Sequence, residues 1–295
     1  MLLIAGGPGD PHVASLLRRA SERGVRHLPL LSGDGALPRI TWELAADRLS
    51  IDGREARPTA LFVRYDAYGP HVDGRPETAR AALAWYETVR GWALAHPEVR
   101  TANRRADPQV SKPLALVLAR RAGLAVPRTW LSNELDALAE AADGARIAKP
   151  VNGGGFARDL AELLASTERR AGKTAAPAFV QARLEHPEVR IYAAGAGERR
   201  RFVAFRILSD ALDYRAAGET PVLHLPLDTI DPDVLAGLGA VMDALALDWA
   251  AADFKTDPET GRLAFLEVNS NPAFDAFDAA SAHAVSDALL DHLAR

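Results

Sequence analysis

The first hundred residues alternate short apolar runs with segments whose apolar residues recur at helical spacing. The apolar runs at 2–5, 25–31 and 60–63 are typical of strands. Apolar residues three and four positions apart predict a helix that begins near Val13 and ends at Gly24, and a second helix over 77–95. Strands that alternate with helices in this way favour a largely parallel sheet with helices on its faces. The glycines at 6–9 lack the G-x-G-x-x-G spacing of dinucleotide-binding turns, so that interpretation is disfavoured.

A second unit begins near Asn103, and its pattern is richer in strands. Helices are expected at 112–122, 159–169, 233–246 and 281–293, and strands at 125–130, 146–149, 178–181, 189–194, 201–207 and 221–225. Two further strands, at 249–255 and 263–268, are expected to form a hairpin across a turn at 257–261. The pattern therefore predicts an α/β protein whose second part contains more antiparallel sheet than the first.

Composition narrows the function classes. The 295 residues are 48% apolar and 25% charged with a net charge of −4, which is typical of a folded globular protein and gives no general attraction to nucleic acid or membranes. No cysteine is present, which excludes disulfides, thiolate metal sites and a cysteine nucleophile. No apolar run is long enough to span a bilayer and the N-terminal run is too short for a signal peptide, so we expect a cytoplasmic protein.

Lysine is rare in this chain, which makes each lysine informative. Of 35 basic residues only four are lysines, at positions 112, 149, 173 and 255. Lys149 ends a predicted strand, and Gly153, Gly154 and Gly155 follow it. Glycine-rich backbone can approach phosphate oxygens and a lysine supplies a compensating charge, although the order of a Walker A loop is absent. An ordinary flexible turn remains an alternative for this segment.

A group of oxygen-bearing side chains lies in the predicted hairpin. Glu267 and Asn269 are two positions apart on one strand and therefore share a face, whereas Leu266 and Val268 are expected to point into the core. Pairing of the hairpin can bring Asp253 beside them. Two carboxylates buried together are costly without a cation, and oxygen ligands without Cys or His favour Mg²⁺ over Zn²⁺. Solvent-facing charges at strand ends remain the alternative.

Taken in order, these segments resemble the ATP-grasp superfamily, and within it the ribosomal-protein glutamate ligases and the microviridin-type (graspetide) peptide ligases. The resemblance covers about residues 100–275. The matching positions are Lys112, Lys149 with Gly153–Gly155, the linker Gln181-Ala182-Arg183-Leu184, Glu188-Val189-Arg190, Asp213-Tyr214-Arg215, and the set Asp253, Glu267 and Asn269. A further match is the aliphatic-x-x-Arg element that ends at Arg64 and Tyr65. The linker carries Ala182-Arg183 where many relatives have Glu-Tyr, and Glu188 replaces the commoner Asp.

The resemblance implies a fold and an assignment of roles. It implies a pre-ATP-grasp α/β domain over 1–102, a central subdomain over 103–182 and a C-terminal subdomain over 183–295, with ATP held between the last two. The implied nucleotide contacts are Lys112, Lys149, Gly153, Gly154, Gly155, Gln181, Ala182, Arg183, Leu184 and Glu188. Asp253, Glu267 and Asn269 would bind two Mg²⁺ ions, with Mn²⁺ as an alternative metal, and Arg190 and Arg215 would act on the substrate carboxylate or acyl phosphate. Arg64, Tyr65 and Asn271 are the implied substrate contacts.

The implied reaction is ATP-dependent ligation of a carboxylate to an amine through an acyl phosphate. Our leading hypothesis is a ligase that joins an amino acid to an amine or to a second amino acid, with small-molecule substrates as its partners. An alternative is a ligase that modifies a ribosomally made precursor peptide by ester or amide crosslinks. A nucleotide-binding regulatory protein without turnover is disfavoured because all three implied metal ligands are present. The oligomeric state, including a homodimer, stays open.

Overall fold

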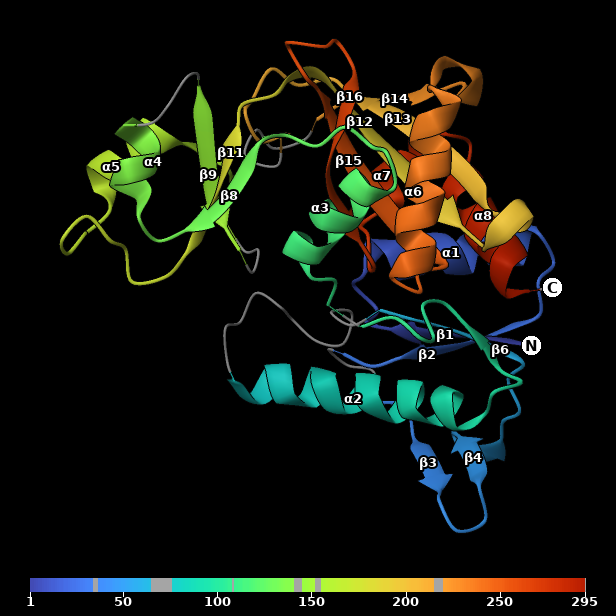
Figure 1. The fold of residues 1–295 in the computed structure, drawn as a ribbon. Coiled ribbons are helices and arrows are strands. Elements are labelled where there is room, and N and C mark those ends of the chain that lie inside the picture. The colour runs from blue at the N-terminus through green and yellow to red at the C-terminus, as the bar shows by residue number, and fades with distance from the viewer. Residues whose placement is uncertain are drawn as a thin grey trace.

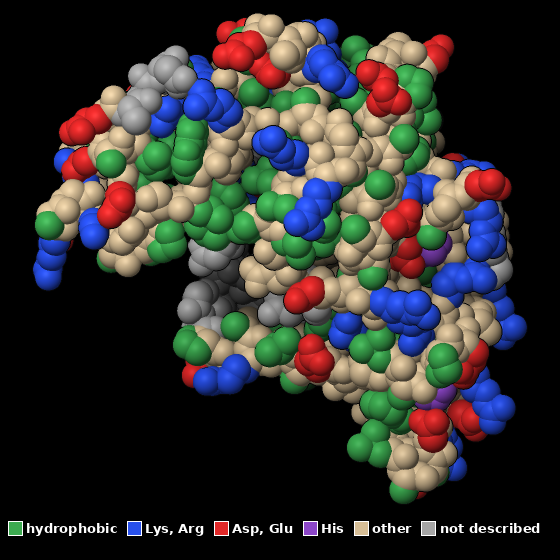
Figure 2. Space-filling view, viewed as in Figure 1, with side chains coloured by type: hydrophobic (Ala, Val, Ile, Leu, Met, Phe, Trp, Pro, Cys, Tyr) green, Lys and Arg blue, Asp and Glu red, His purple; other side chains and the backbone are tan. Residues whose placement is uncertain are grey.

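The protein is described from a computed structural model, which places residues 1–33, 37–64, 76–107, 109–140, 145–151, 155–214 and 220–294. Figure 1 shows a main body made of the N-terminal and C-terminal parts of the chain, and a smaller unit of sheet and two helices to its left. In the space-filling view this smaller unit forms a projecting lobe, and Lys and Arg side chains are numerous along the right-hand edge, near the chain termini (Figure 2). No helix among the described residues is long and apolar enough to cross a membrane.

The N-terminal unit is built on a parallel sheet, as the sequence predicts. Its strands are β1 (Leu2–Gly6), β2 (His27–Leu31), β6 (Ala60–Val63) and β7 (Arg100–Thr101), in the order β2-β1-β6-β7. Helices α1 (Pro11–Glu22) and α2 (Pro76–Ala95) cover opposite faces of this sheet (Figure 1). Side chains of β1 alternate between the two helices, because Leu2 and Ile4 join the core beside α1 whereas Leu3 and Ala5 join the core beside α2.

A small antiparallel sheet is an addition that the sequence pattern did not predict. It contains β3 (Ile40–Glu43), β4 (Arg48–Ile51) and β5 (Arg54–Glu55). Leu49 and Ile51 on β4 are buried in the core beside α2, and Trp42 on β3 packs against the same core. Strands of two to four residues are too short for their alternation to stand out in the sequence.

The central unit is an antiparallel sheet with helices on one face. Its strands β8 (Thr129–Ser132), β9 (Arg146–Pro150), β10 (Arg158–Asp159) and β11 (Ala178–Ala182) lie in the order β10-β9-β11-β8. Helices α4 (Leu135–Glu140) and α5 (Leu160–Ser166) pack on Ala148 and Val180. Lys149 and Gln181, each one position further along, therefore lie on the opposite face of this sheet.

The C-terminal unit is a larger antiparallel sheet in the order β14-β13-β12-β15-β16. Its strands are β12 (Glu185–Ala194), β13 (Arg201–Ile207), β14 (Val222–Leu225), β15 (Trp249–Thr256) and β16 (Leu263–Asn269). One face packs against α3 (Lys112–Arg121) and α6 (Pro232–Ala244), and the other against α1, α7 (Asp275–Ala280) and α8 (Ala284–Leu293). Because α1 packs against both sheets, the N-terminal and C-terminal units share one hydrophobic core.

The predicted elements agree with this structure apart from local differences. The hairpin of β15 and β16 forms as predicted, and α3 begins at Lys112 with Ser111 as its N-cap. The helix expected at 281–293 forms as α8, which begins only at Ala284 because Ala282 and His283 adopt left-handed backbone angles. The short helix α7, which precedes it, was not predicted.

Candidate active site

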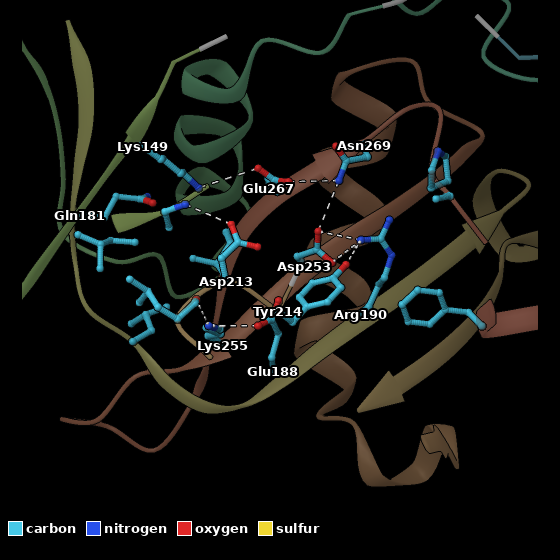
Figure 3. A pocket seen from close by; sticks show the side chains of 18 of the residues that line it. Lys149, Gln181, Glu188, Arg190, Asp213, Tyr214, Asp253, Lys255, Glu267 and Asn269 are labelled. Atoms are coloured by element: carbon cyan, nitrogen blue, oxygen red, sulfur yellow. Dashed lines mark hydrogen bonds and ion pairs between the residues drawn. The ribbon is translucent and has the colours of Figure 1, made fainter. Parts of the chain in front are cut away.

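A cavity of about 450 Å³ lies between the central sheet and the C-terminal sheet. Figure 3 shows its lining side chains, which come from β9 and β11 on one side and mainly from β12, β15 and β16 on the other. Residues 212–214 after β13 and residues 271–273 after β16 also line it. A cavity of this size is in the range of small-ligand sites. The labelled lining residues are Lys149, Gln181, Glu188, Arg190, Asp213, Tyr214, Asp253, Lys255, Glu267 and Asn269.

Strand register explains how the acidic residues meet. Arg190 on β12 is paired with Asp253 on β15, which is paired with Glu267 on β16, so all three side chains form one row across the sheet. Arg190 Nη1 donates to Asp253 Oδ1 at 3.0 Å and Oδ2 at 3.1 Å. Asn269 Nδ2 donates at 3.4 Å to Asp253 Oδ2 and at 3.4 Å to Glu267 Oε1. The structure therefore brings the three expected metal ligands together.

A β-bulge at Leu266 corrects one sequence prediction. Asp253 pairs with Glu267 but Phe254 pairs with Phe265, so Leu266 is an extra residue on β16. The alternation predicted that Leu266 points into the core, whereas the bulge turns this side chain to the cavity, which it lines. The prediction for Leu266 was wrong because strict alternation holds only in a regular ladder. Val268 is buried in the core as predicted.

Two lysines face the carboxylate of Glu267. Lys112 Nζ lies 2.8 Å from Glu267 Oε2, and Lys149 Nζ lies 3.9 Å from the same oxygen. Burial alone would raise the pKa of Glu267, but the charges of Lys149 and Lys112 outweigh it and lower the pKa to about 2. Lys149 Nζ also lies 5.7 Å from the centre of the Phe179 ring, which is within the range of a cation–π contact. The paired lysines place positive charge where the resemblance expects phosphates.

The acidic set fits Mg²⁺ in combination with a phosphorylated ligand. Within the described ranges, no three His, Cys, Asp or Glu side chains cluster closely enough to hold a metal by themselves. Asp253 and Glu267 supply two carboxylates, and Asn269 supplies an amide that can offer its oxygen once a cation replaces the contacts of its nitrogen. Protein sites bind Mg²⁺ through one or two carboxylates, with water and substrate phosphates completing the octahedron.

The other end of the cavity contains an unsatisfied acceptor. Gln181 is fully buried and lines the cavity, and its Nε2 donates to Thr129 Oγ1 at 3.0 Å. Its Oε1 has no hydrogen-bond partner among the residues that the structure describes. A buried acceptor without a partner is costly unless a ligand supplies a donor. Ala182 and Leu184 of the expected linker also line the cavity. The side chain of Arg183 is exposed and does not line it.

The other residues that the resemblance implied as substrate or nucleotide contacts differ in whether they line the cavity. Arg64 is buried outside the cavity lining, where its Nε donates to Asp10 Oδ2 at 3.0 Å and its Nη1 donates to the Pro272 carbonyl at 2.8 Å. Asn271 lines the cavity. Gly155 does not, and a Cβ at its position would lie 2.9 Å from Pro150 Cγ. Tyr65, Gly153, Gly154 and Arg215 lie outside the described residues.

Lys255 and Asp213 line the cavity although the sequence analysis gave them no role of their own. Lys255 Nζ lies 3.1 Å from Glu188 Oε2, and both side chains are buried. Burial raises the pKa of Glu188, while the charge of Lys255 opposes this shift. The spacing from Asp253 to Lys255, two positions on one strand, was the available signal that Lys255 shares the face of the acidic set.

The fold is shared with solved ATP-grasp ligases. The ATP-grasp ligase PsnB, complexed with minimal precursor, matches with a TM-score of 0.75 and 25% identity over 99% of this chain and 98% of PsnB. The macrocyclase MdnC from Microcystis aeruginosa MRC, bound with precursor peptide MdnA, matches with a TM-score of 0.70 and 17% identity over 99% of both chains. The chain has the ATP-grasp fold.

A more distant match is the VanG D-Ala:D-Ser ligase from Enterococcus faecalis, with a TM-score of 0.61 and 14% identity over 99% of this chain and 97% of VanG. No family model and no curated protein matches the sequence. The expected α/β ATP-grasp fold, the resemblance to the peptide-ligase branch and the expectation of an ATP-grasp ligase enzyme are confirmed by the structural matches. PsnB has also been solved with its minimal precursor, Mg and ADP, which agrees with the expected cofactors.

Proposed function

We propose that this ATP-grasp ligase uses Mg²⁺ and ATP to form ester or amide bonds within a ribosomally made precursor peptide. The observation that carries the proposal is the match to PsnB over nearly the whole of both chains, together with the row of acidic residues in the cavity and the two lysines that pair with Glu267. This was the alternative in the sequence analysis, and we now favour it over a dipeptide-type ligase. The match to VanG, at 14% identity, supports the dipeptide-type ligase less strongly.

The first proposed step transfers the γ-phosphoryl group of ATP to a substrate carboxylate, which gives an acyl phosphate and ADP. Lys112 and Lys149, which contact Glu267 in the structure, would hold phosphate oxygens. Asp253, Glu267 and Asn269 would hold Mg²⁺, which neutralises charge on the phosphates when it is bound. Gln181 Oε1, a buried acceptor, would receive a hydrogen bond from a donor on the base of the nucleotide.

The second proposed step forms the new bond. An amine or hydroxyl of the substrate attacks the acyl carbon, loses its proton and displaces inorganic phosphate. Arg190 and Arg215 are the residues that we propose for the carboxylate and acyl phosphate, because a guanidinium binds oxyanions through two parallel hydrogen bonds. Arg190 is held in place by Asp253 and by the hydroxyl of Tyr192, to which its Nε donates at 3.0 Å.

The proposal is tested by ADP release from Mg-ATP with two sets of substrates. One set contains the twenty amino acids singly and in pairs, and the other contains synthetic peptides encoded by short reading frames beside the gene. We expect ADP release with a peptide, and loss of one water from that peptide for each bond formed, measured by mass spectrometry. The Glu267→Gln variant is the control for contaminating ATPase.

Two outcomes would overturn the proposal. ADP release that requires a particular pair of amino acids would establish a dipeptide-type ligase instead. ATP binding without turnover on either substrate set would favour the regulatory protein over both enzymes.

A further inference from the structure

Three consecutive residues connect separate parts of the cavity. The carbonyl of Leu212 accepts a hydrogen bond of 2.8 Å from Lys255 Nζ on β15. Asp213 Oδ2 accepts a hydrogen bond of 3.2 Å from the backbone N–H of Ala157, which directly precedes β10 in the central unit. The Tyr214 hydroxyl accepts a hydrogen bond of 3.3 Å from Arg190 Nη1 on β12. We refer to residues 212–214 as the tie segment.

The anchor of the tie segment is a buried lysine. Lys255 is 6% exposed and Glu188 is 5% exposed, and their 3.1 Å ion pair lies in the cavity wall (Figure 3). An ammonium at this depth needs several acceptors to offset its desolvation. Glu188 and the Leu212 carbonyl supply two of these acceptors. The position of Leu212 is therefore coupled to the buried ammonium of Lys255.

The hydrogen bond that Asp213 accepts connects the two sides of the cavity. The tie segment follows β13 in the C-terminal unit, whereas Ala157 lies on the connection from β9 to β10 in the central unit. Arg158, which follows Ala157, pairs with Ala148 next to Lys149 on β9, so the bond from Ala157 to Asp213 links the strand that carries Lys149 to the C-terminal unit that carries Glu267. Hydrogen bonds that involve a charged acceptor are roughly twice as strong as neutral ones.

We propose that Asp213 is a positioning residue of the ligase, which fixes the lysine-bearing side of the cavity relative to the acidic side, and that Lys255 holds Asp213 in place. The proposal rests on the proposed function, since it concerns the geometry in which ATP would be bound. Asp213 acts as a hydrogen-bond acceptor for the Ala157 N–H. Its effect on the reaction therefore depends first on an acceptor atom at this position, and the negative charge strengthens the bond that this atom accepts.

Two substitutions of Asp213 separate these properties. Asp213→Ala removes the acceptor, and we expect the Kd for Mg-ATP to rise about tenfold, which is the effect of losing one charge-assisted hydrogen bond. Asp213→Asn keeps an oxygen acceptor of the same reach, and we expect its Kd to stay within about threefold of the wild type. Asp210→Ala removes an exposed carboxylate from the same stretch of chain and is the matched control. Equal losses in Asp213→Asn and Asp213→Ala would overturn the proposal.

Hydrogen exchange gives a readout that general destabilisation does not produce. The Ala157 amide is protected by its bond to Asp213, so we expect Asp213→Ala to accelerate exchange of the peptide that contains Ala157 while peptides from β15 and β16 keep their rates. Faster exchange throughout the C-terminal sheet would indicate misfolding and would contradict a local positioning role. Wild-type ATP binding in the same experiment separates failure of this proposal from failure of the proposed function.

The role of Lys255 is tested by a double-mutant cycle. If Lys255 acts through Asp213, the loss of affinity in the double variant Lys255→Met/Asp213→Ala should be close to that of the more damaging single variant. If the fold-change in Kd of the double variant equals the product of the two single fold-changes, the two residues act independently, and the coupling that we propose is overturned. The cycle uses titration of Mg-ATP into the full-length chain, so it does not require the peptide substrate.

Discussion

Replacement of Glu267 by Gln tests the electrostatics of the cavity quantitatively. Glu267 is held by Lys112 at 2.8 Å and by Lys149 at 3.9 Å, and its pKa is about 2 instead of the ordinary 4.5. One pKa unit corresponds to about 1.4 kcal/mol, so the surroundings favour the charged carboxylate over its neutral form by about 3 kcal/mol. Gln cannot carry the charge and leaves two ammonium groups facing each other. We expect the free energy of unfolding at pH 7 to fall by about 3 kcal/mol.

The stabilisation by Glu267 should decrease as the pH is lowered. Because the pKa of Glu267 is lower in the folded state than in the unfolded state, its stabilisation is complete above about pH 4.5 and is lost as the pH falls toward 2. The difference in unfolding free energy between wild type and Glu267→Gln should therefore be constant from pH 7 to about pH 5. By about pH 3.5 this difference in unfolding free energy should narrow by about 1 kcal/mol.

The assay is urea unfolding followed by tryptophan fluorescence at each pH, with ΔG and the m-value fitted for both proteins. Glu259→Gln, an exposed carboxylate in the turn between β15 and β16, is the control for general charge effects. The reasoning would be refuted if the difference in unfolding free energy between wild type and Glu267→Gln stayed the same down to about pH 3.5. It would also be refuted if Glu259→Gln lowered the unfolding free energy as much as Glu267→Gln does. Unequal m-values would show that the variant changed the unfolding reaction rather than the stability alone.

Three further predictions concern binding and packing. Lys149→Ala should raise the KM for ATP more than the KM for the acceptor in steady-state kinetics, and a change confined to the acceptor would show that this lysine is misplaced. Asn103→Ala should lower the free energy of unfolding by about 3 kcal/mol. It removes side-chain hydrogen bonds to the backbone of β15 and to the Ser270 carbonyl, and it places Ala at a left-handed φ of 54°, which Asn tolerates better. A loss below about 1 kcal/mol in urea unfolding would contradict this. Gly237→Ala should be destabilising by about 1–3 kcal/mol, because a Cβ there would lie 2.6 Å from Leu124 Cδ2, whereas at Gly239 the nearest atom belongs to a flexible arginine end. Thermal unfolding that ranks Gly239→Ala as the more damaging change would contradict that packing argument.

The sequence predicted the elements that depend on long, regular patterns. The parallel N-terminal sheet, the hairpin of β15 and β16, and the strand that ends near Lys149 all form as expected. The set of Asp253, Glu267 and Asn269 could be placed because residues two apart share a face and a hairpin pairs its strands directly.

The remaining features depend on contacts that no local pattern contains. The bulge at Leu266 arises from the pairing of β15 with β16, and the position of Arg64 depends on a carbonyl more than two hundred residues away. Lys255 could be recognised as a rare lysine, but its pairing with Glu188 and Leu212 depends on the packing of separate strands and loops.

The central claim is that the cavity binds ATP together with Mg²⁺ between the paired lysines and the acidic row. Calorimetric titration of ATP into the wild type and into Glu267→Gln, each with Mg²⁺ and with EDTA, tests this claim without knowledge of the peptide. We predict that ATP binds the wild type, that Mg²⁺ strengthens this binding, and that Glu267→Gln loses the strengthening by Mg²⁺. Absence of ATP binding by the folded wild type, or an equal effect of Mg²⁺ on both proteins, would contradict the account.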